Sequence, residues 1–168
     1  NKNSAAIRTL LKQRAKVNAP QADGMTALHW ATYHDDLETV KLLLAAGADA
    51  KGANRYGVTP LSLACTNGNS AIVELLLDSG ADANTTLPGG ETVLMIASRT
   101  GRLGAVQALL AHGAKVDARA QKGQTARMWG AAEGQGGVGG ALRQEGAERA
   151  TRPPWGFAPR VSARCAGG

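Results

Sequence analysis

Aromatic residues, cysteines and long apolar runs are all scarce in this sequence. Aromatic residues make up 4% of the 168 residues, and there are two cysteines. No stretch approaches the roughly 18 consecutive apolar residues that a membrane-spanning helix requires, and no signal peptide opens the chain. Cys65 and Cys165 are far apart and no Cys-x-x-Cys motif occurs, so a disulfide framework and a cysteine-based zinc site are not supported.

The sequence also lacks a basic region within its regular part, although the formal net charge is +6. Residues 1–120 carry 12 Lys and Arg against 10 Asp and Glu, whereas residues 121–168 carry 7 against 3. The same last segment holds 11 of the 22 glycines. The positive charge therefore follows a change of composition near the C-terminus, and we expect no nucleic-acid partner.

An internal repeat with a period of 33 residues dominates the rest of the chain. A threonine recurs at this spacing and is preceded two residues earlier by glycine, as in Gly57-Val58-Thr59. The second half of each unit repeats as well, with Leu-Leu followed by Gly-Ala. The recurring positions are Thr26, Thr59, Thr92 and Thr125; Leu43-Leu44, Leu76-Leu77 and Leu109-Leu110; and Gly47, Gly80 and Gly113.

The residue pattern of each unit predicts two short helices. Thr26, Thr59 and Thr92 can cap the first helix with their hydroxyl groups, and Pro60 suits the first helical position because no N–H is needed there. His29 stands three residues after Thr26, where its side chain can reach back to the helix start. The second helix carries a stripe of Leu, Ile and Val.

The repeating glycines are expected to close each second helix, because Gly47, Gly80 and Gly113 follow its last apolar residues and glycine is the preferred residue for a left-handed helix end. Helices this short are marginal in isolation, since an isolated helix needs roughly 12 to 15 residues. The units must therefore stack on one another to bury their apolar stripes.

These repeats resemble the ankyrin repeat, whose signature is Gly-x-Thr-Pro-Leu-His-x-Ala followed by Leu-Leu and Gly-Ala-Asp. Residues 57–82 match it most fully, and the resemblance extends from residue 1 to about residue 150. It implies an all-α fold, an ankyrin repeat α-solenoid of helix-turn-helix pairs with β-turn fingers. It further implies a non-enzymatic role as a protein-protein interaction scaffold that needs no cofactor and no metal.

The repeat register divides the chain into six segments. Because the chain begins with Asn1 inside a helical pattern, we expect it to be part of a longer product. The segments are a half repeat containing only the second helix at 1–20, ankyrin repeats at 21–52, 53–85 and 86–118, a degraded repeat at 119–152, and the eroded, disordered start of a further repeat at 153–168.

The fifth unit departs from the pattern at four positions. Arg127, Gly130, Gly139 and Arg143 replace Leu, Ala, Val and Leu of the earlier units. Each of these positions is expected on the buried side, where glycine weakens a helix and an unpaired charge is costly. We therefore predict that this unit loses most of its packing, either through relaxed selection or through an error in the coding sequence.

Partner-binding residues are expected at the finger tips and on the exposed side of the first helices, where residue types vary between units while the frame stays constant. Aromatic and arginine side chains are favoured as anchors because they dominate interface energetics. The candidate positions are Asp23, Met25, Tyr33, His34, Arg55, Tyr56, Val58, Asn67, Glu91, Arg99 and Lys122. The positions assigned to the frame are Thr26, His29, Gly47, Thr59, Pro60, Gly80, Thr92 and Gly113.

Other chemistry is less well supported. The Gly134–Gly139 stretch matches Gly-x-Gly-x-x-Gly but lacks the preceding strand that this phosphate-binding motif requires. His29, His34, Asp35 and Asp36 contain metal-ligand types, but no second cluster converges on them.

One alternative function stays open, namely that the segment regulates, or tethers substrate for, a larger enzyme whose catalytic domain lies outside this chain. The partner is taken to be an unidentified protein and the chain to be monomeric. The compartment stays open, with the cytoplasm slightly favoured.

Overall fold

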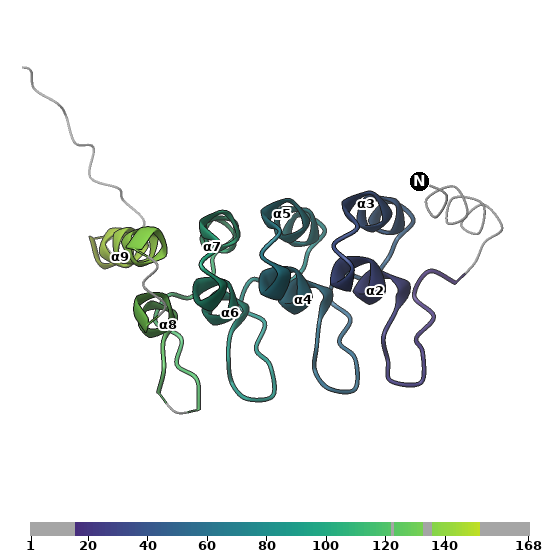
Figure 1. Cartoon of the computed structure of the whole chain (residues 1–168), viewed down its shortest axis with the longest axis horizontal. Helices are drawn as coiled ribbons and strands as arrows, with labels where there is room; N and C mark the ends of the chain where they lie inside the picture. Colours follow the sequence, from purple (N-terminus) through teal and green to yellow (C-terminus); the bar gives the residue numbers. More distant parts are fainter. Residues whose placement is uncertain (1–15, 122, 133–135, 152–168) are drawn as a thin grey trace, which may run out of the picture.

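The computed structural model describes residues 16–121, 123–132 and 136–151, and these residues contain eight helices in four pairs. In Figure 1 the first helices of the pairs form one row, the second helices form another, and the fingers project from the row of first helices. The predicted all-α solenoid is confirmed. The pairs are α2 (Ala27–Tyr33) with α3 (Leu37–Ala45), α4 (Pro60–Asn67) with α5 (Ser70–Asp78), α6 (Val93–Thr100) with α7 (Leu103–Ala111), and α8 (Ala126–Ala132) with α9 (Gly136–Thr151).

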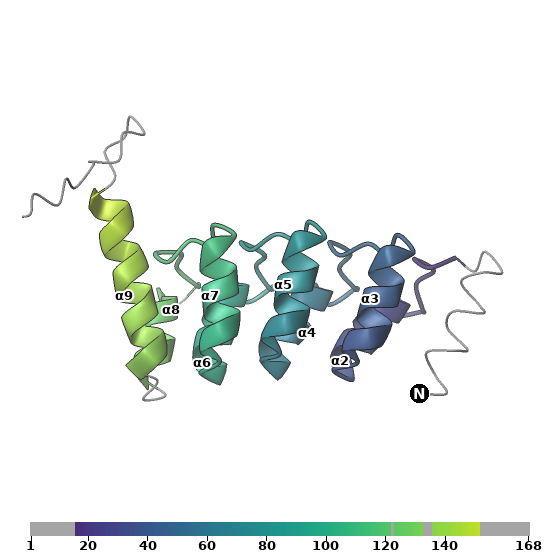
Figure 2. The ribbon, with the colours of Figure 1, turned by 90° about the horizontal axis from the view of Figure 1, so that it is seen from above.

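The core lies between the two rows and between successive units. Each first helix packs on the next along α2, α4, α6 and α8, and the second helices do the same, as Figure 2 shows from above. Leu61, Ile72 and Leu76 are fully buried in this layer. Ala64 and Ala97 are also fully buried, and their small side chains allow close helix packing. No helix in the described part of the chain is long and apolar enough to cross a membrane.

The turns between paired helices use left-handed backbone conformations. Gly68 and Gly101 follow α4 and α6 with φ values of 75° and 70°. Asp35 stands at the same repeat position after α2 and has a φ of 58°. Aspartate tolerates this region better than most residues because its short polar side chain can form local hydrogen bonds. The path of the chain is therefore kept where glycine is missing.

His29 joins two successive units. Its Nδ1 atom accepts a hydrogen bond from the Thr26 backbone N–H at 3.2 Å, and its Nε2 atom lies 3.1 Å from the Val58 carbonyl oxygen in the next finger. Since Nδ1 is the acceptor, Nε2 carries the proton and donates it. In the following unit Ser62 takes the same place, where its hydroxyl accepts from the Thr59 N–H at 3.0 Å. The buried imidazole therefore adds a bond between units that serine cannot make.

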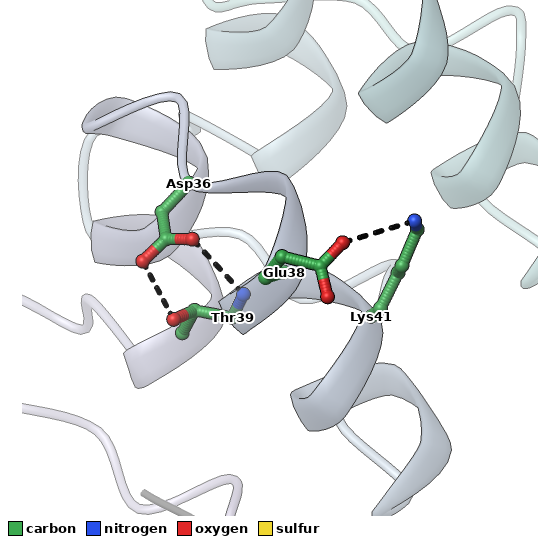
Figure 3. Close-up of polar contacts among 4 residues, drawn as sticks. All are labelled: Asp36, Glu38, Thr39 and Lys41. Atoms are coloured by element: carbon green, nitrogen blue, oxygen red, sulfur yellow. Dashed lines mark hydrogen bonds and ion pairs between the residues drawn. The ribbon is translucent and has the colours of Figure 1, made fainter. Parts of the chain in front are cut away.

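Asp36 caps the start of α3. As Figure 3 shows, one carboxylate oxygen accepts from the Thr39 backbone N–H at 3.1 Å and the other from the Thr39 hydroxyl at 2.7 Å. These two bonds, the side-chain bond first, lower the pKa of Asp36 below its ordinary value of 3.8. The neighbouring Glu38–Lys41 ion pair, also drawn in Figure 3, joins Glu38 Oε1 to Lys41 Nζ over 3.2 Å, but it is exposed and contributes little to stability.

Replacing this cap should cost stability in a pH-dependent way. We expect Asp36→Ala to lower the free energy of unfolding at pH 7 by about 1 kcal/mol, a typical value for a lost N-cap. Because folding lowers the pKa of Asp36, its contribution is present above about pH 4 and declines as the pH falls further. Urea denaturation at pH 7 and pH 3 measures both effects.

Asp36→Asn is the matched control, because Asn69 caps α5 at the same repeat position by accepting from the backbone N–H groups of Ala71 and Ile72. This variant should keep most of the stability at pH 7 and lose the acid dependence that Asp36 contributes. An Asn variant as unstable as the Ala variant would contradict the capping role.

The fifth unit is better packed than its sequence predicts. Val138 and Leu142 of α9 are buried, as are their counterparts in α5 and α7, and Gly130 of α8 is buried beside Val138. Arg127 and Arg143 are exposed, so the prediction that these two positions lie on the buried side is wrong. The reason is geometric, since a long arginine side chain can carry its charge to water from a helix surface.

Helix α9 also runs further than the register predicts. Gly146 stands 33 residues after Gly113, yet α9 continues through it to Thr151 instead of ending in a left-handed turn. The absent side chain of Gly146 makes room for Arg127, because an added Cβ atom would lie 2.8 Å from the Arg127 guanidinium. The glycine that ends the earlier second helices therefore accommodates a neighbouring side chain here.

Candidate functional site

The fingers share one backbone geometry, which holds their tips in fixed positions. In the second finger the Asn54 N–H donates to the Val58 carbonyl oxygen at 2.9 Å, and the Gly57 N–H donates to the Asn54 carbonyl oxygen at 3.0 Å. The other three fingers repeat both bonds at the matching positions. The Arg55 N–H also donates to the Asp23 carbonyl oxygen at 3.0 Å, which ties the second finger to the first.

Close packing between fingers depends on glycine, as Gly24 and Gly57 show. A Cβ atom added to Gly57 would lie 2.9 Å from the Pro88 ring, and one added to Gly24 would lie 3.1 Å from the backbone of Asn54 and Arg55. Both glycines also have a positive φ that other residues rarely adopt. The fingers therefore form a continuous row, and their side chains are presented from a rigid backbone.

The structure places ten of the eleven predicted contact positions along this row or on the first helices, and Lys122 lies outside the described residues. Tyr33, His34, Arg55, Tyr56, Asn67 and Arg99 are exposed. Asp23, Met25, Val58 and Glu91 are only half-buried, and the carboxylate of Asp23 accepts from the Met25 N–H within its own finger. These ten residues therefore differ in how much of the side chain is accessible to a partner.

The side chain of Asn67 forms hydrogen bonds that the sequence did not reveal. Its side-chain N–H group donates to the Thr32 and Tyr33 carbonyl oxygens, at 2.9 and 3.2 Å. These carbonyl groups belong to the last turn of α2, and the Thr32 carbonyl oxygen also accepts from the Asp35 N–H at 3.0 Å. Asn67 thus joins the ends of two successive first helices, which limits its freedom to contact a partner.

Trp30 and Met128 are exposed residues on first helices that sequence reasoning missed as contacts. The place of Trp30 in the repeat is held by Leu63 and Ile96 in the next units, which favoured the core or a half-buried groove over a ligand contact. In the structure 38% of Trp30 is exposed, and its indole N–H donates to the Gln21 side chain at 3.2 Å. Tyr33 lies on the same helix and His34 directly follows it. Because both were predicted to be exposed, the sequence did hold a signal that Trp30 is exposed as well.

Two of the four residues considered for metal binding, His29 and Asp36, are already engaged. Both ring nitrogens of His29 and both carboxylate oxygens of Asp36 take part in hydrogen bonds within the protein. Burial, opposed in part by the bond to Val58, lowers the pKa of His29. Within the described ranges no group of three His, Cys, Asp or Glu residues gathers into a cluster that could hold a metal ion.

Cys65 and the glycine-rich stretch offer no reactive group on this surface. Cys65 is fully buried in α4, and burial raises the pKa of its thiol to about 12, so the reactive thiolate is strongly disfavoured. Gly134 lies outside the described residues, whereas Gly136, Gly137 and Gly139 belong to α9. They therefore do not form a loop that could surround a phosphate.

Stacked helix pairs with a rigid row of fingers define a solenoid repeat protein. A family model described as ankyrin repeats, in three copies, matches residues 1–87 and again residues 80–148. The chain therefore belongs to the ankyrin repeat family. Ankyrin repeats generally mediate protein-protein interactions, and the family is typically non-catalytic.

One curated relative shows how the repeats occur in a longer protein. Ankyrin repeat and LEM domain-containing protein 1 homolog from Caenorhabditis elegans is 48% identical over 50 residues. The match covers 30% of this chain and 7% of that protein. The chain thus corresponds to only a small part of this relative.

Proposed function

We propose that this chain binds a partner protein along the finger tips and the exposed side of the first helices. The observation that carries this proposal is the distribution of exposed apolar side chains in the described residues. Of the five large exposed ones, Trp30, Tyr33 and Met128 lie on first helices and Tyr56 lies on a finger, whereas Leu103 begins a second helix. Exposed apolar groups gathered on one side of a protein favour an interaction surface.

Tyr56 and Arg55 are the strongest anchors at the fingers. Tyr56 is 69% exposed, the highest value among the large exposed apolar residues, and Arg55 is also exposed. The backbone of both residues is held by hydrogen bonds, because the Tyr56 N–H donates to the Asn54 side chain and the Arg55 N–H donates to Asp23. A partner would therefore lose little binding energy to ordering of this finger.

Binders selected from a displayed library of protein fragments against the whole chain test this surface. We expect the Arg55→Ala, Tyr56→Ala double variant to weaken most selected binders by at least about tenfold, because aromatic and arginine anchors carry most interface energy. Affinity is measured by calorimetry, and circular dichroism checks that the variant remains folded.

The matched control changes two exposed side chains on the second helices. Glu74→Ala and Gln107→Ala lie on α5 and α7, on the row away from the fingers, and should leave binding unchanged. Binders that tolerate loss of Arg55 and Tyr56 but are lost with this control would place the binding surface on the second helices and overturn the proposal.

A further inference from the structure

Three aromatic side chains of the second unit, Trp30, Tyr33 and His34, form an exposed aromatic cluster at the end of α2. The Trp30 and His34 rings lie at 20° to each other with their centroids 6.0 Å apart. The Tyr33 ring stands nearly perpendicular to both, at 6.0 Å from Trp30 and 5.2 Å from His34. Because the Trp30 indole is also bonded to Gln21, the cluster is oriented before any partner arrives.

The unit that carries the aromatic cluster is acidic. This unit, residues 21–52, holds Asp49 and two lysines, Lys41 and Lys51, besides four carboxylates in its first 20 residues, Asp23, Asp35, Asp36 and Glu38, and Lys41 pairs with Glu38. Asp35 and Asp36 directly follow His34 in the turn between the helices, and none of the four carboxylates is buried. Negative charge beside the electron-rich faces of aromatic rings favours a cationic ligand over a neutral or anionic one.

The chain contains an internal example of such a contact. Trp129 stands in α8 at the same repeat position as Trp30, three repeats further along. The guanidinium group of Arg99, which comes from the preceding first helix, lies over the Trp129 ring at 5.5 Å from its centroid. A tryptophan at this position of the solenoid therefore accepts an arginine side chain from outside its own helix.

We propose that the aromatic cluster binds an arginine side chain of the partner protein. Arginine is favoured over lysine because its planar guanidinium can stack on an aromatic face, and the Arg99 guanidinium already lies over the Trp129 ring. This inference rests on the binding function proposed above, since α2 belongs to the same row of first helices. It assigns the contact with the partner's cationic group to the second unit. Arg55 and Tyr56 remain the anchors on the neighbouring finger.

Titration with short peptides tests the arginine site directly. The probes are Ac-Gly-Ser-Arg-Ser-Gly-NH2 and the same peptide with citrulline, which has nearly the shape of arginine but no charge. We expect the arginine peptide to shift the Trp30 indole N–H resonance with saturation in the millimolar range, and the citrulline peptide to bind at least about fivefold more weakly.

The repeat supplies the matched variant. Leu63 and Thr66 occupy the positions of Trp30 and Tyr33 in the next unit, so Trp30→Leu with Tyr33→Thr replaces the cluster with residues that this fold already accommodates. The double variant should bind the arginine peptide at least about tenfold more weakly than the wild type, with binding followed through the amide resonances of α2. Tyr56→Ala should bind the peptide as the wild type does.

Three results would overturn the arginine site: no shift at peptide concentrations up to about 10 mM, equal binding of citrulline, or binding unaffected by the double variant. The fragment selection separates this failure from failure of the binding function. Selected binders that need Arg55 and Tyr56 but not Trp30 and Tyr33 would sustain the interaction surface and exclude the arginine site.

Discussion

Replacing Leu76 by alanine should destabilise the protein by about 3–4 kcal/mol and lower its melting temperature by about 10 °C. Leu76 is fully buried in α5, which packs against α3, α4 and α7. In a solenoid the stability is the sum of the units and of their shared interfaces, so a cavity in a central unit weakens contacts on both sides. Urea denaturation followed by circular dichroism measures the loss.

Leu142→Ala is the matched variant for this experiment. Leu142 occupies the same repeat position in α9 and is equally buried, but α9 packs only against α7 and α8 in the described part of the chain. We expect a loss of less than half that of Leu76→Ala, with faster hydrogen exchange confined to α8 and α9. Equal losses at the two positions would contradict the view that the fifth unit contributes less to the shared core.

Replacing His29 by serine should remove about 1–3 kcal/mol of stability at pH 7. Serine can restore the bond to the Thr26 N–H, as Ser62 does in the next unit, but it cannot reach the Val58 carbonyl oxygen. The variant therefore loses the bond between units and leaves a small cavity in place of the buried imidazole. Thermal unfolding of the two proteins at several pH values measures the difference.

The same variant should change the pH dependence of stability. Burial lowers the pKa of His29 below its ordinary value of 6.5, so the unfolded chain takes up this proton at a higher pH than the folded chain does. The wild type is therefore fully stabilised above about pH 6.5 and loses stability as the pH falls below it. The His29→Ser variant lacks this loss, and the two stabilities should approach each other in acid.

His34→Asn is the control for this pair, because Asn67 holds the same repeat position and His34 is exposed. Its stability at pH 7 should match that of the wild type. If the difference in stability between the wild type and His29→Ser stays constant from pH 7 to pH 5, His29 is excluded as the titrating group.

The repeat frame could be predicted from the sequence because the same residue types recur at the same positions of successive units. Thr59 and Pro60 begin a helix by local chemistry, and glycine at Gly68 or Gly101 ends one through its access to left-handed conformations. Even Asp35, where the glycine is missing, could be assigned to the same turn from the register alone. Local preferences and the period agree at these positions.

Contacts between units were beyond the reach of the sequence. The period of 33 residues aligns Arg127 with the buried Leu28 and Leu61, yet Arg127 is exposed, because its long side chain can carry the charge to water. The amide of Asn67 is held by carbonyl groups of α2, and Trp30 is exposed although its counterparts are leucine and isoleucine. A register assigns a position in the fold but not the side chains that meet there.

The sequence by itself determined that this chain is a stack of short helix pairs, because the 33-residue period and the Thr, Pro and Gly positions act locally and recur. Only the tertiary structure decided which side chains the stack exposes. Burial depends on neighbours about 30 residues away, as the bond from His29 to Val58 shows, and these distances become short only when the units pack. The row of fingers is a property of that packing, as the bond from the Arg55 N–H to the Asp23 carbonyl oxygen shows.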